Sequence, residues 1–166
     1  MVNRCEECDF EYDLAQASNA AISIVADAAD FAAMISGSGD DVRTRREPAV
    51  WSALEYGCHL RDVLLVQRER VLTARRRRRP SFEPMGRDER VDHDGYAQQE
   101  PADVADQLTM AAQLFANDLE RLGRDDWDRI VLYNYPRRTE RSLRWVAVHT
   151  VHEVRHHLLD ARRQLA

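Results

Sequence analysis

The feature that most constrains the fold is a series of four long amphipathic segments separated by helix-breaking residues. The expected helices span about residues 14–35, 48–79, 101–122 and 139–166. Gly37 and Gly39 close the first segment, Pro80 follows the second, and Gly123 closes the third, and glycine and proline in such places end helices. No strand is expected. Four helices of roughly 20 residues predict an all-α chain that folds as a four-helix bundle.

The starts and connections of these helices follow from the same rules. Asp13 is a candidate N-cap for the first helix, and Pro48 suits the first turn of the second. Residues 80–100 are rich in Pro, Gly and acidic side chains, which predicts a long irregular connection between helices two and three that crosses the length of the bundle. Tyr135 and Pro136 interrupt the chain before the last helix. We therefore expect an N-terminal arm over residues 1–13 and one bundle domain over residues 14–166.

Composition narrows the class of protein. The chain has 166 residues, of which 44% are hydrophobic, which suffices for one core. No apolar run is expected to approach the roughly 18 to 20 residues of a membrane span, and the acidic start does not resemble a secretory leader. All 24 basic residues are Arg, and the net charge of −5 argues against general binding of nucleic acid. These features predict a cytoplasmic protein without a membrane or nucleic-acid partner.

Metal chemistry is indicated by the sequence HEVRH in the last helix, from His152 to His156. Two histidines four residues apart lie one turn apart on nearly the same helix face and can share an ion. The pattern also matches the HExxH motif of zinc peptidases. Leu159 and Arg162 stand where the longer peptidase motif requires Gly and His, and no sheet is expected beside the helix, so a peptidase or hydrolase is the less favoured reading.

A third ligand is expected from the second helix. His59 has Glu55 one turn before it and Asp62 one turn after it, and this polar patch interrupts an apolar helix. On the last helix, His152 and His156 belong to a 4-3-4-3 spacing typical of an inward seam. We therefore predict that His59, His152 and His156 hold a divalent ion with one position open, zinc being favoured and nickel the alternative.

The same residues suggest a family. A single His in helix two, a connection to a third helix, and the final helix SLRWVAVHTVHEVRHHLLDARRQL resemble the DinB-like superfamily of four-helix metal proteins. That superfamily includes mycothiol-dependent maleylpyruvate isomerases and bacillithiol or mycothiol S-transferases. The resemblance implies His59, His152 and His156 as ligands and leaves His157, about 100° around the helix from His156, without a role.

The activity implied by this resemblance is the activation of a low-molecular-weight thiol such as mycothiol for attack on a small electrophile. Glu153 and Asp62 are the candidate catalytic residues, with Glu55 as an alternative to Asp62. Tyr133, Arg144 and Trp145 could form the mouth of the pocket and hold an anionic substrate, or they could simply pack over the bundle end. A metal-binding stress-response module without turnover satisfies the same sequence facts, and a homodimer through an outer helix face is compatible with them.

The chain contains three cysteines, Cys5, Cys8 and Cys58. Their odd number fits a reducing compartment, and Cys58 is expected to be a small core residue. Cys5 and Cys8 form a C-x-x-C pair, which is half of a tetrahedral zinc site, because the chain has no second such pair. Inert thiols, a metal or disulfide clip on the arm, and a redox role all remain open for it.

Overall fold

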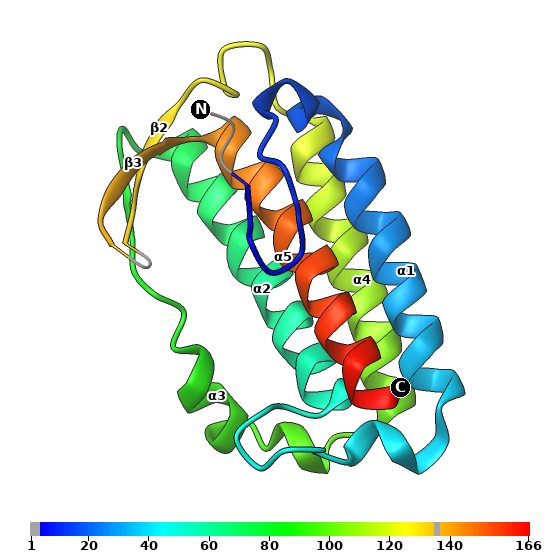
Figure 1. Cartoon of the computed structure of the whole chain (residues 1–166). Helices are drawn as coiled ribbons and strands as arrows, with labels where there is room; N and C mark the ends of the chain where they lie inside the picture. The colour runs from blue at the N-terminus through cyan, green and yellow to red at the C-terminus, as the bar shows by residue number, and fades with distance from the viewer. Residues whose placement is uncertain (1–3, 135–136) are drawn as a thin grey trace.

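The protein is a four-helix bundle, seen in a computed structural model that describes residues 4–134 and 137–166. The long helices are α1 (Ala20–Gly37), α2 (Ala53–Arg76), α4 (Pro101–Glu120) and α5 (Leu143–Leu165). α1 packs against α4 and α5, and α2 packs against the same two helices. α1 and α2 therefore lie diagonally opposite each other in the bundle (Figure 1). The predicted all-α four-helix bundle is confirmed.

The first helix begins as the sequence predicts. A short 3-10 helix, η1 (Leu14–Asn19), precedes α1, and Asp13 is its N-cap, with Oδ1 accepting a hydrogen bond from the backbone N of Ala15 at 3.0 Å. A second 3-10 helix, η2 (Gly39–Arg43), lies in the connection to α2. The N-cap side chain satisfies one of the backbone donors that a helix start leaves free.

One expectation about α1 was wrong. Residues Leu14–Gly37 form a helical stretch that is long and apolar enough, by length and composition alone, to cross a membrane. A core helix of a soluble protein passes the same test, and Ile24 and Phe31 of α1 are fully buried in the common core. The stretch is apolar because it is rich in alanine, which allows α1 to pack closely against its neighbours.

The second helix starts later than predicted, at Ala53 rather than near Pro48. Ser52 Oγ accepts a hydrogen bond from the Glu55 backbone N at 3.2 Å, and Glu55 Oε2 accepts one from the Ser52 backbone N at 2.7 Å. This reciprocal capping box fixes the helix start more strongly than the upstream proline does. The helix ends at Arg76, so that Arg75 and Arg76 lie in its last turn, where cations complement the helix dipole.

The connection between α2 and α4 is more ordered than expected. It contains the short strand β1 (Ser81–Phe82), helix α3 (Arg87–His93) and the 3-10 helix η3 (Tyr96–Gln98). Figure 1 shows this segment passing from one end of the bundle to the other along its outside. The prediction of a wholly irregular connection was wrong, because its turns are held by contacts with the bundle that the sequence does not reveal.

The expectation of no strands was also wrong. β2 (Ile130–Tyr133) pairs antiparallel with β3 (Thr139–Ser142) and parallel with β1, giving a three-stranded sheet of order β1-β2-β3. Each strand has four residues or fewer and depends on partners distant in the chain, so no periodic pattern marks it. Tyr135 and Pro136, the predicted interruption, lie outside the described residues.

The described part of the N-terminal arm, residues 4–13, lies along α5 (Figure 1). Arg4 and Glu11 form an antiparallel bridge, and the backbone N of Cys5 donates a hydrogen bond to the Phe10 carbonyl at 2.9 Å. The arm is thus a small hairpin. It covers a face of α5 that the four-helix core leaves open.

Candidate metal centre

Helix α5 carries its metal-ligating side chains on two different faces. The buried residues Leu143, Val146, Ala147, Thr150 and Val154 place the core-facing side of the helix between these faces. On one side, Glu153 and His157 approach His59 of α2. On the other, His152 and His156 approach the N-terminal arm.

The first group consists of His59, Glu153 and His157. Each offers one ligand atom, and these atoms all lie within 4.8 Å of one another. His157 Nε2 is 3.7 Å from Glu153 Oε2, and the rings of His59 and His157 have centroids 5.0 Å apart. His59 is 2% exposed and His157 9% exposed, so that the group lies inside the protein. Two imidazoles and a carboxylate form a donor set typical of catalytic zinc.

Neighbouring side chains orient these donors. His157 Nδ1 lies 3.0 Å from Asp160 Oδ2, which leaves Nε2 on the side of Glu153. His149 lies one turn before Glu153, with Nδ1 at 2.9 Å from the Tyr12 hydroxyl and Nε2 at 3.7 Å from Glu153 Oε1. A carboxylate or hydroxyl behind an imidazole fixes the orientation of the ring, as in many metal sites.

The charge states of the group suit a cation. Burial, together with the nearby His157, lowers the pKa of His59 to about 3, so that His59 is neutral at pH 7. Burial alone would raise the pKa of Glu153, but His152, whose Nδ1 lies 3.4 Å from Glu153 Oε1, and the neighbouring histidines outweigh it and lower this pKa to about 2. Glu153 is therefore ionised. Neutral imidazole and ionised carboxylate are the forms that bind metals.

One further observation supports the fit of an ion. His59 Nδ1 is buried and has no hydrogen-bond partner. An unpaired buried nitrogen costs about 1–3 kcal/mol, and a bound ion is one way to offset such a cost. The donors present therefore fit a divalent ion held by His59, Glu153 and His157.

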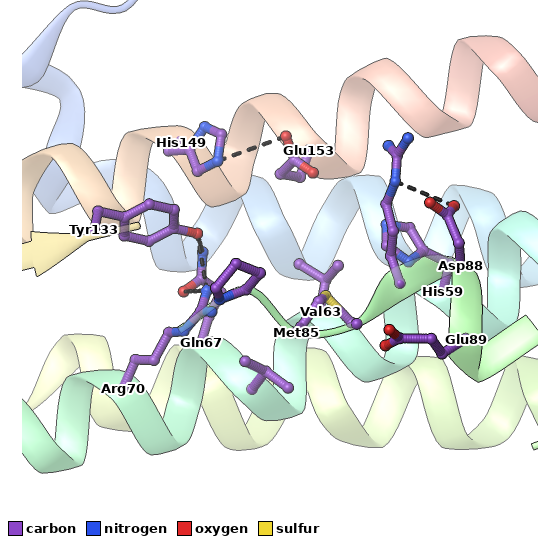
Figure 2. A pocket seen from close by; sticks show the side chains of 14 residues that line it. His59, Val63, Gln67, Arg70, Met85, Asp88, Glu89, Tyr133, His149 and Glu153 are labelled. Carbon is purple, nitrogen blue, oxygen red and sulfur yellow. Dashed lines mark hydrogen bonds and ion pairs between the residues drawn. The ribbon is translucent and has the colours of Figure 1, made fainter. Parts of the chain in front are cut away.

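Two of these donors, His59 and Glu153, line a cavity of about 280 Å³. His59, His149 and Glu153 line one wall, and residues 84–89 of the connection close the opposite side (Figure 2). The cavity can therefore bring a small molecule to the donor group, while the connection between α2 and α4 limits access from solvent.

A polar cluster lies at the far end of the same cavity. The Tyr133 hydroxyl accepts hydrogen bonds from Gln67 Nε2 at 3.0 Å and from Arg70 at 2.9 Å (Figure 2). The Arg70 guanidinium also lies over the Tyr133 ring, 5.0 Å from its centroid. A fixed guanidinium at a cavity wall is a suitable partner for a carboxylate or phosphate.

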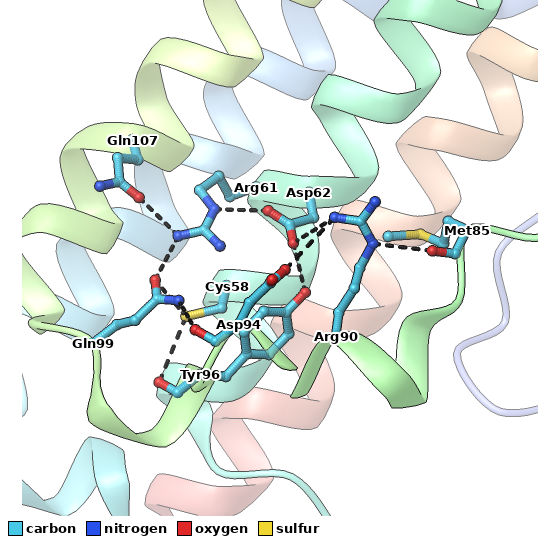
Figure 3. Close-up of polar contacts among 9 residues, drawn as sticks. All are labelled: Cys58, Arg61, Asp62, Met85, Arg90, Asp94, Tyr96, Gln99 and Gln107. Atoms are coloured by element: carbon cyan, nitrogen blue, oxygen red, sulfur yellow. Dashed lines mark hydrogen bonds and ion pairs between the residues drawn. The ribbon is translucent and has the colours of Figure 1, made fainter. Parts of the chain in front are cut away.

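Asp62, a predicted catalytic residue, faces away from this cavity. Its carboxylate accepts hydrogen bonds from Arg61 at 2.8 Å, from Arg90 at 3.2 Å and from the Tyr96 hydroxyl at 2.7 Å (Figure 3). Arg90 in turn donates to the Met85 carbonyl at 3.0 Å. Asp62 thus joins α2 to the connection that covers the cavity, and this placement does not support a role at the metal. The alternative, Glu55, is engaged in the capping box and an ion pair with Arg45.

The structure separates the predicted triad. His59 lies with Glu153 and His157, whereas His152 and His156 lie with Cys5 and Cys8. The interpretation that all three histidines share one ion is corrected accordingly. The physical reason is the rotation of α5: pairs 152/156 and 153/157 both satisfy a spacing of four, and only the packing shows which pair faces α2.

The remaining predicted residues are distributed as follows. Tyr133 lines the cavity, as described above. Trp145 stacks on His149 at 4.4 Å between centroids and does not line the cavity. Arg144 bonds Asp128 at 2.8 Å and is likewise absent from the cavity wall. His93 ends α3 and belongs to none of the metal-ligating groups found among the described residues.

Sequence reasoning did not place His157 with His59 and Glu153, nor Cys5 and Cys8 with His152 and His156. It left His157 without a role, and a metal or disulfide clip was one of three readings left open for Cys5 and Cys8. A signal was present in the sequence: C-x-x-C combined with His-x-x-x-His is a zinc-ligand pattern, although Cys5 and His156 are 151 positions apart.

The fold and the donors define a four-helix bundle with a candidate metal centre. The profile of the DinB superfamily matches residues 24–161, and the chain belongs to that superfamily. Among solved structures it is similar to YfiT from Bacillus subtilis, described as a probable metal-dependent hydrolase with an unusual four-helix bundle topology. The TM-score is 0.78 at 13% identity, with 89% of this chain and 85% of that chain covered. No curated protein matches the sequence.

Proposed function

We propose that this protein is a metal-dependent enzyme that acts on a small anionic molecule in the cavity beside His59, Glu153 and His157. The observation that carries this proposal is a two-His, one-carboxylate donor group of which His59 and Glu153 line a cavity that also presents Arg70 and Tyr133. Three protein donors leave at least one position of a tetrahedral ion for a substrate or water.

The chemistry supplied by a bound divalent ion is Lewis acidity, which polarises a carbonyl or favours the thiolate form of a thiol. Zinc is our first choice, because it accepts imidazole and carboxylate together, and nickel is the alternative. In this proposal Glu153, which the sequence suggested as a catalytic residue, is instead a ligand of the metal ion. His149 also lines the cavity, and since Tyr12 holds its Nδ1 while its Nε2 faces Glu153, it serves to orient this carboxylate.

The substrate class follows from the cavity wall. Arg70 and Arg87 both line the cavity, and Tyr133 lies beside Arg70. The lining also includes the apolar side chains of Val63, Val66 and Met85. A small molecule with an apolar body and a carboxylate or similar anion matches this lining.

The reaction we favour is thiol transfer. The thiol releases its proton to solvent, and the resulting thiolate sulfur of a small thiol such as mycothiol forms a bond to an electrophilic carbon of the substrate. Either a leaving group departs with its electron pair, or the new bond is later broken to give an isomer. The family resemblance supports this reaction.

Hydrolysis is the second candidate. The two-His, one-Glu donor set is also that of zinc hydrolases, and the similar structure, YfiT, is described as a probable metal-dependent hydrolase. The HExxH peptidase arrangement is not favoured, because His152 and His156 approach the arm rather than the cavity.

The test uses full-length protein purified without an affinity tag and loaded separately with zinc, nickel or manganese. Each form is mixed with an electrophile such as chlorodinitrobenzene in the presence or absence of mycothiol, and with simple esters. Thiol-dependent conversion that is lost in His157→Ala and kept in His93→Ala supports transfer. Hydrolysis of the esters without thiol, lost in the same variant, supports the second candidate.

Absence of conversion with every metal would refute the enzymatic proposal and favour a metal-binding stress-response module. Location in the cytoplasm, and dimerisation through an outer helix face, remain separate proposals. Sedimentation velocity distinguishes a dimer from a monomer directly.

A further inference from the structure

The N-terminal hairpin brings the C-x-x-C pair to the outer face of α5. The Asp9 backbone N donates a hydrogen bond to the Cys5 carbonyl at 2.9 Å, and Asp9 adopts a φ of 59°. Residues 6–8 form a turn that follows Cys5 and includes Cys8. This tight turn places Cys5 and Cys8 close enough together to offer both sulfurs to one ligand.

Aromatic contacts hold the hairpin against α5. The Phe10 ring lies 5.3 Å from the His152 ring, and the Tyr12 ring lies 5.3 Å from the same ring on another side. The guanidinium of Arg155 lies over Phe10, 6.0 Å from its centroid. The arm is therefore packed on the helix rather than resting near it.

Four donors converge where the hairpin meets the helix. Cys5, Cys8, His152 and His156 each offer one ligand atom, and all four atoms lie within 4.8 Å of one another. Cys5 Sγ is 3.8 Å from His156 Nδ1. Zinc bonds of about 2.0–2.3 Å in a tetrahedron require ligand atoms about 3.3–3.8 Å apart. The donors therefore need to move little to enclose an ion.

A second observation points to a ligand at this place. His152 is 9% exposed, and both of its ring nitrogens are buried without a hydrogen-bond partner. Leaving such a group unpaired costs about 1–3 kcal/mol. Nδ1 of this ring lies 3.4 Å from Glu153 Oε1, which leaves Nε2 free for an ion. An imidazole backed by a carboxylate is a common arrangement for a zinc ligand.

The second histidine has the same surroundings. His156 Nδ1 is directed toward Cys5, while its Nε2 lies 3.3 Å from Glu7 Oε2 and 3.5 Å from Asp160 Oδ2. Both imidazoles therefore have a carboxylate on the side away from the sulfurs.

We propose that Cys5, Cys8, His152 and His156 form a tetrahedral structural zinc site that fastens the N-terminal arm to α5. Two thiolates and two imidazoles fill all four positions, so this site is closed, unlike the three-donor group at the cavity. Binding requires both cysteines as thiolates and therefore releases their protons. Free thiols in the structure leave both sulfurs available.

The proposed Cys5/Cys8/His152/His156 zinc site also affects the orientation of the side chains at the cavity. The arm that it fastens carries Tyr12, whose hydroxyl bonds His149, and His149 is directed toward Glu153. Loss of the structural zinc would free the arm and remove one of the contacts that orient the cavity donors. The two sites share no ligand, but Glu153, a donor at the cavity, also lies 3.4 Å from His152 Nδ1, so the separate tests alter Cys5 and Cys8 at one site and His59 at the other.

The test measures zinc content in full-length protein purified without an affinity tag, kept reduced, loaded with zinc and desalted. We expect two zinc ions per chain in the wild type, one in Cys5→Ser/Cys8→Ser, one in His59→Ala and none in the combined variant. Cys58→Ala is the matched control and should keep both, because the buried Cys58 thiol faces Tyr96 and Gln99 rather than either donor group.

Cobalt distinguishes the two sites by spectroscopy. Cobalt-loaded wild type and His59→Ala should show a thiolate-to-cobalt charge-transfer band, and Cys5→Ser/Cys8→Ser should lack it. His156→Ala should also weaken the band, which tests the site without altering a cysteine. Loss of zinc in the cysteine variant with no loss in His59→Ala would uphold this proposal and refute the cavity metal.

Two results would overturn the proposal. One is a Cys5→Ser/Cys8→Ser variant that keeps the zinc content and cobalt spectrum of the wild type. The other is a Cys5–Cys8 disulfide, found by mass spectrometry in freshly purified protein that contains no zinc at this place.

Discussion

Asp62 offers a sharp test of how the cavity is held closed. Its side chain is 7% exposed and accepts charge-assisted hydrogen bonds from Arg61 and Arg90 as well as one from Tyr96. Asp62→Asn keeps the size of the side chain but removes its charge and turns one acceptor into a donor. That donor would face a guanidinium or a hydroxyl, so about two of the charge-assisted hydrogen bonds are lost.

The magnitude follows from these contacts. Two hydrogen bonds to a charged group contribute about 3–6 kcal/mol, and the share of Arg90 must be discounted because its side chain is 35% exposed. We expect Asp62→Asn to lower the free energy of unfolding by about 3 kcal/mol. For a chain of this length that corresponds to a fall in Tm of roughly 6–12 °C.

The pH dependence gives an independent check. Burial would raise the pKa of Asp62, but hydrogen bonds from Arg61 and Tyr96 outweigh it and lower this pKa. A lowered pKa in the folded state means that the stabilisation is complete above the unfolded pKa of about 3.9 and is lost as the pH falls through the folded value. The difference between wild type and variant should therefore be constant from pH 7 to about 5 and shrink below about 4.

The assay is urea unfolding followed by circular dichroism, with Asp106→Asn as the control because Asp106 is exposed on α4. Hydrogen exchange should also increase across residues 84–96, since Asp62 holds Arg90 and Arg90 holds Met85. A loss below about 1 kcal/mol, or unchanged exchange in that segment, would refute the structural role assigned to Asp62.

Three further predictions concern the core, a helix start and the metal. Phe115→Ala should lower the free energy of unfolding by about 3–5 kcal/mol, because the ring is fully buried; a loss near that of the exposed control Met110→Ala, measured by urea unfolding, would contradict this. Ser52→Ala should cost about 1 kcal/mol by removing the capping box of α2, and an unchanged Tm in calorimetry would show that the cap is unimportant. Glu153→Gln should weaken metal binding at the cavity at least about 10-fold by removing a ligand charge, and equal affinity in chelator competition would exclude Glu153 as a ligand.

Local patterns explain which helix boundaries were predictable. Asp13 marked the first helix start, and Gly123 marked the end of the third, because caps and breakers act within one turn. The start of α2 was misplaced because a proline at position 48 and a Ser-x-x-Glu box at 52–55 both signal a helix start. The three strands were not predicted from the sequence because their pairing joins segments far apart in the chain.

The sequence by itself determined that four amphipathic helices would form a bundle, that histidines of the second and last helices would be available to a metal, and that the family would be DinB-like. These properties depend on spacing and residue type. Tertiary structure alone decided which turn of α5 faces α2 and what the N-terminal arm covers. A spacing of four describes His152/His156 and Glu153/His157 equally well, and a rotation of one helix about its axis exchanges them. That rotation is set by core packing among all four helices, so no local pattern could have specified it.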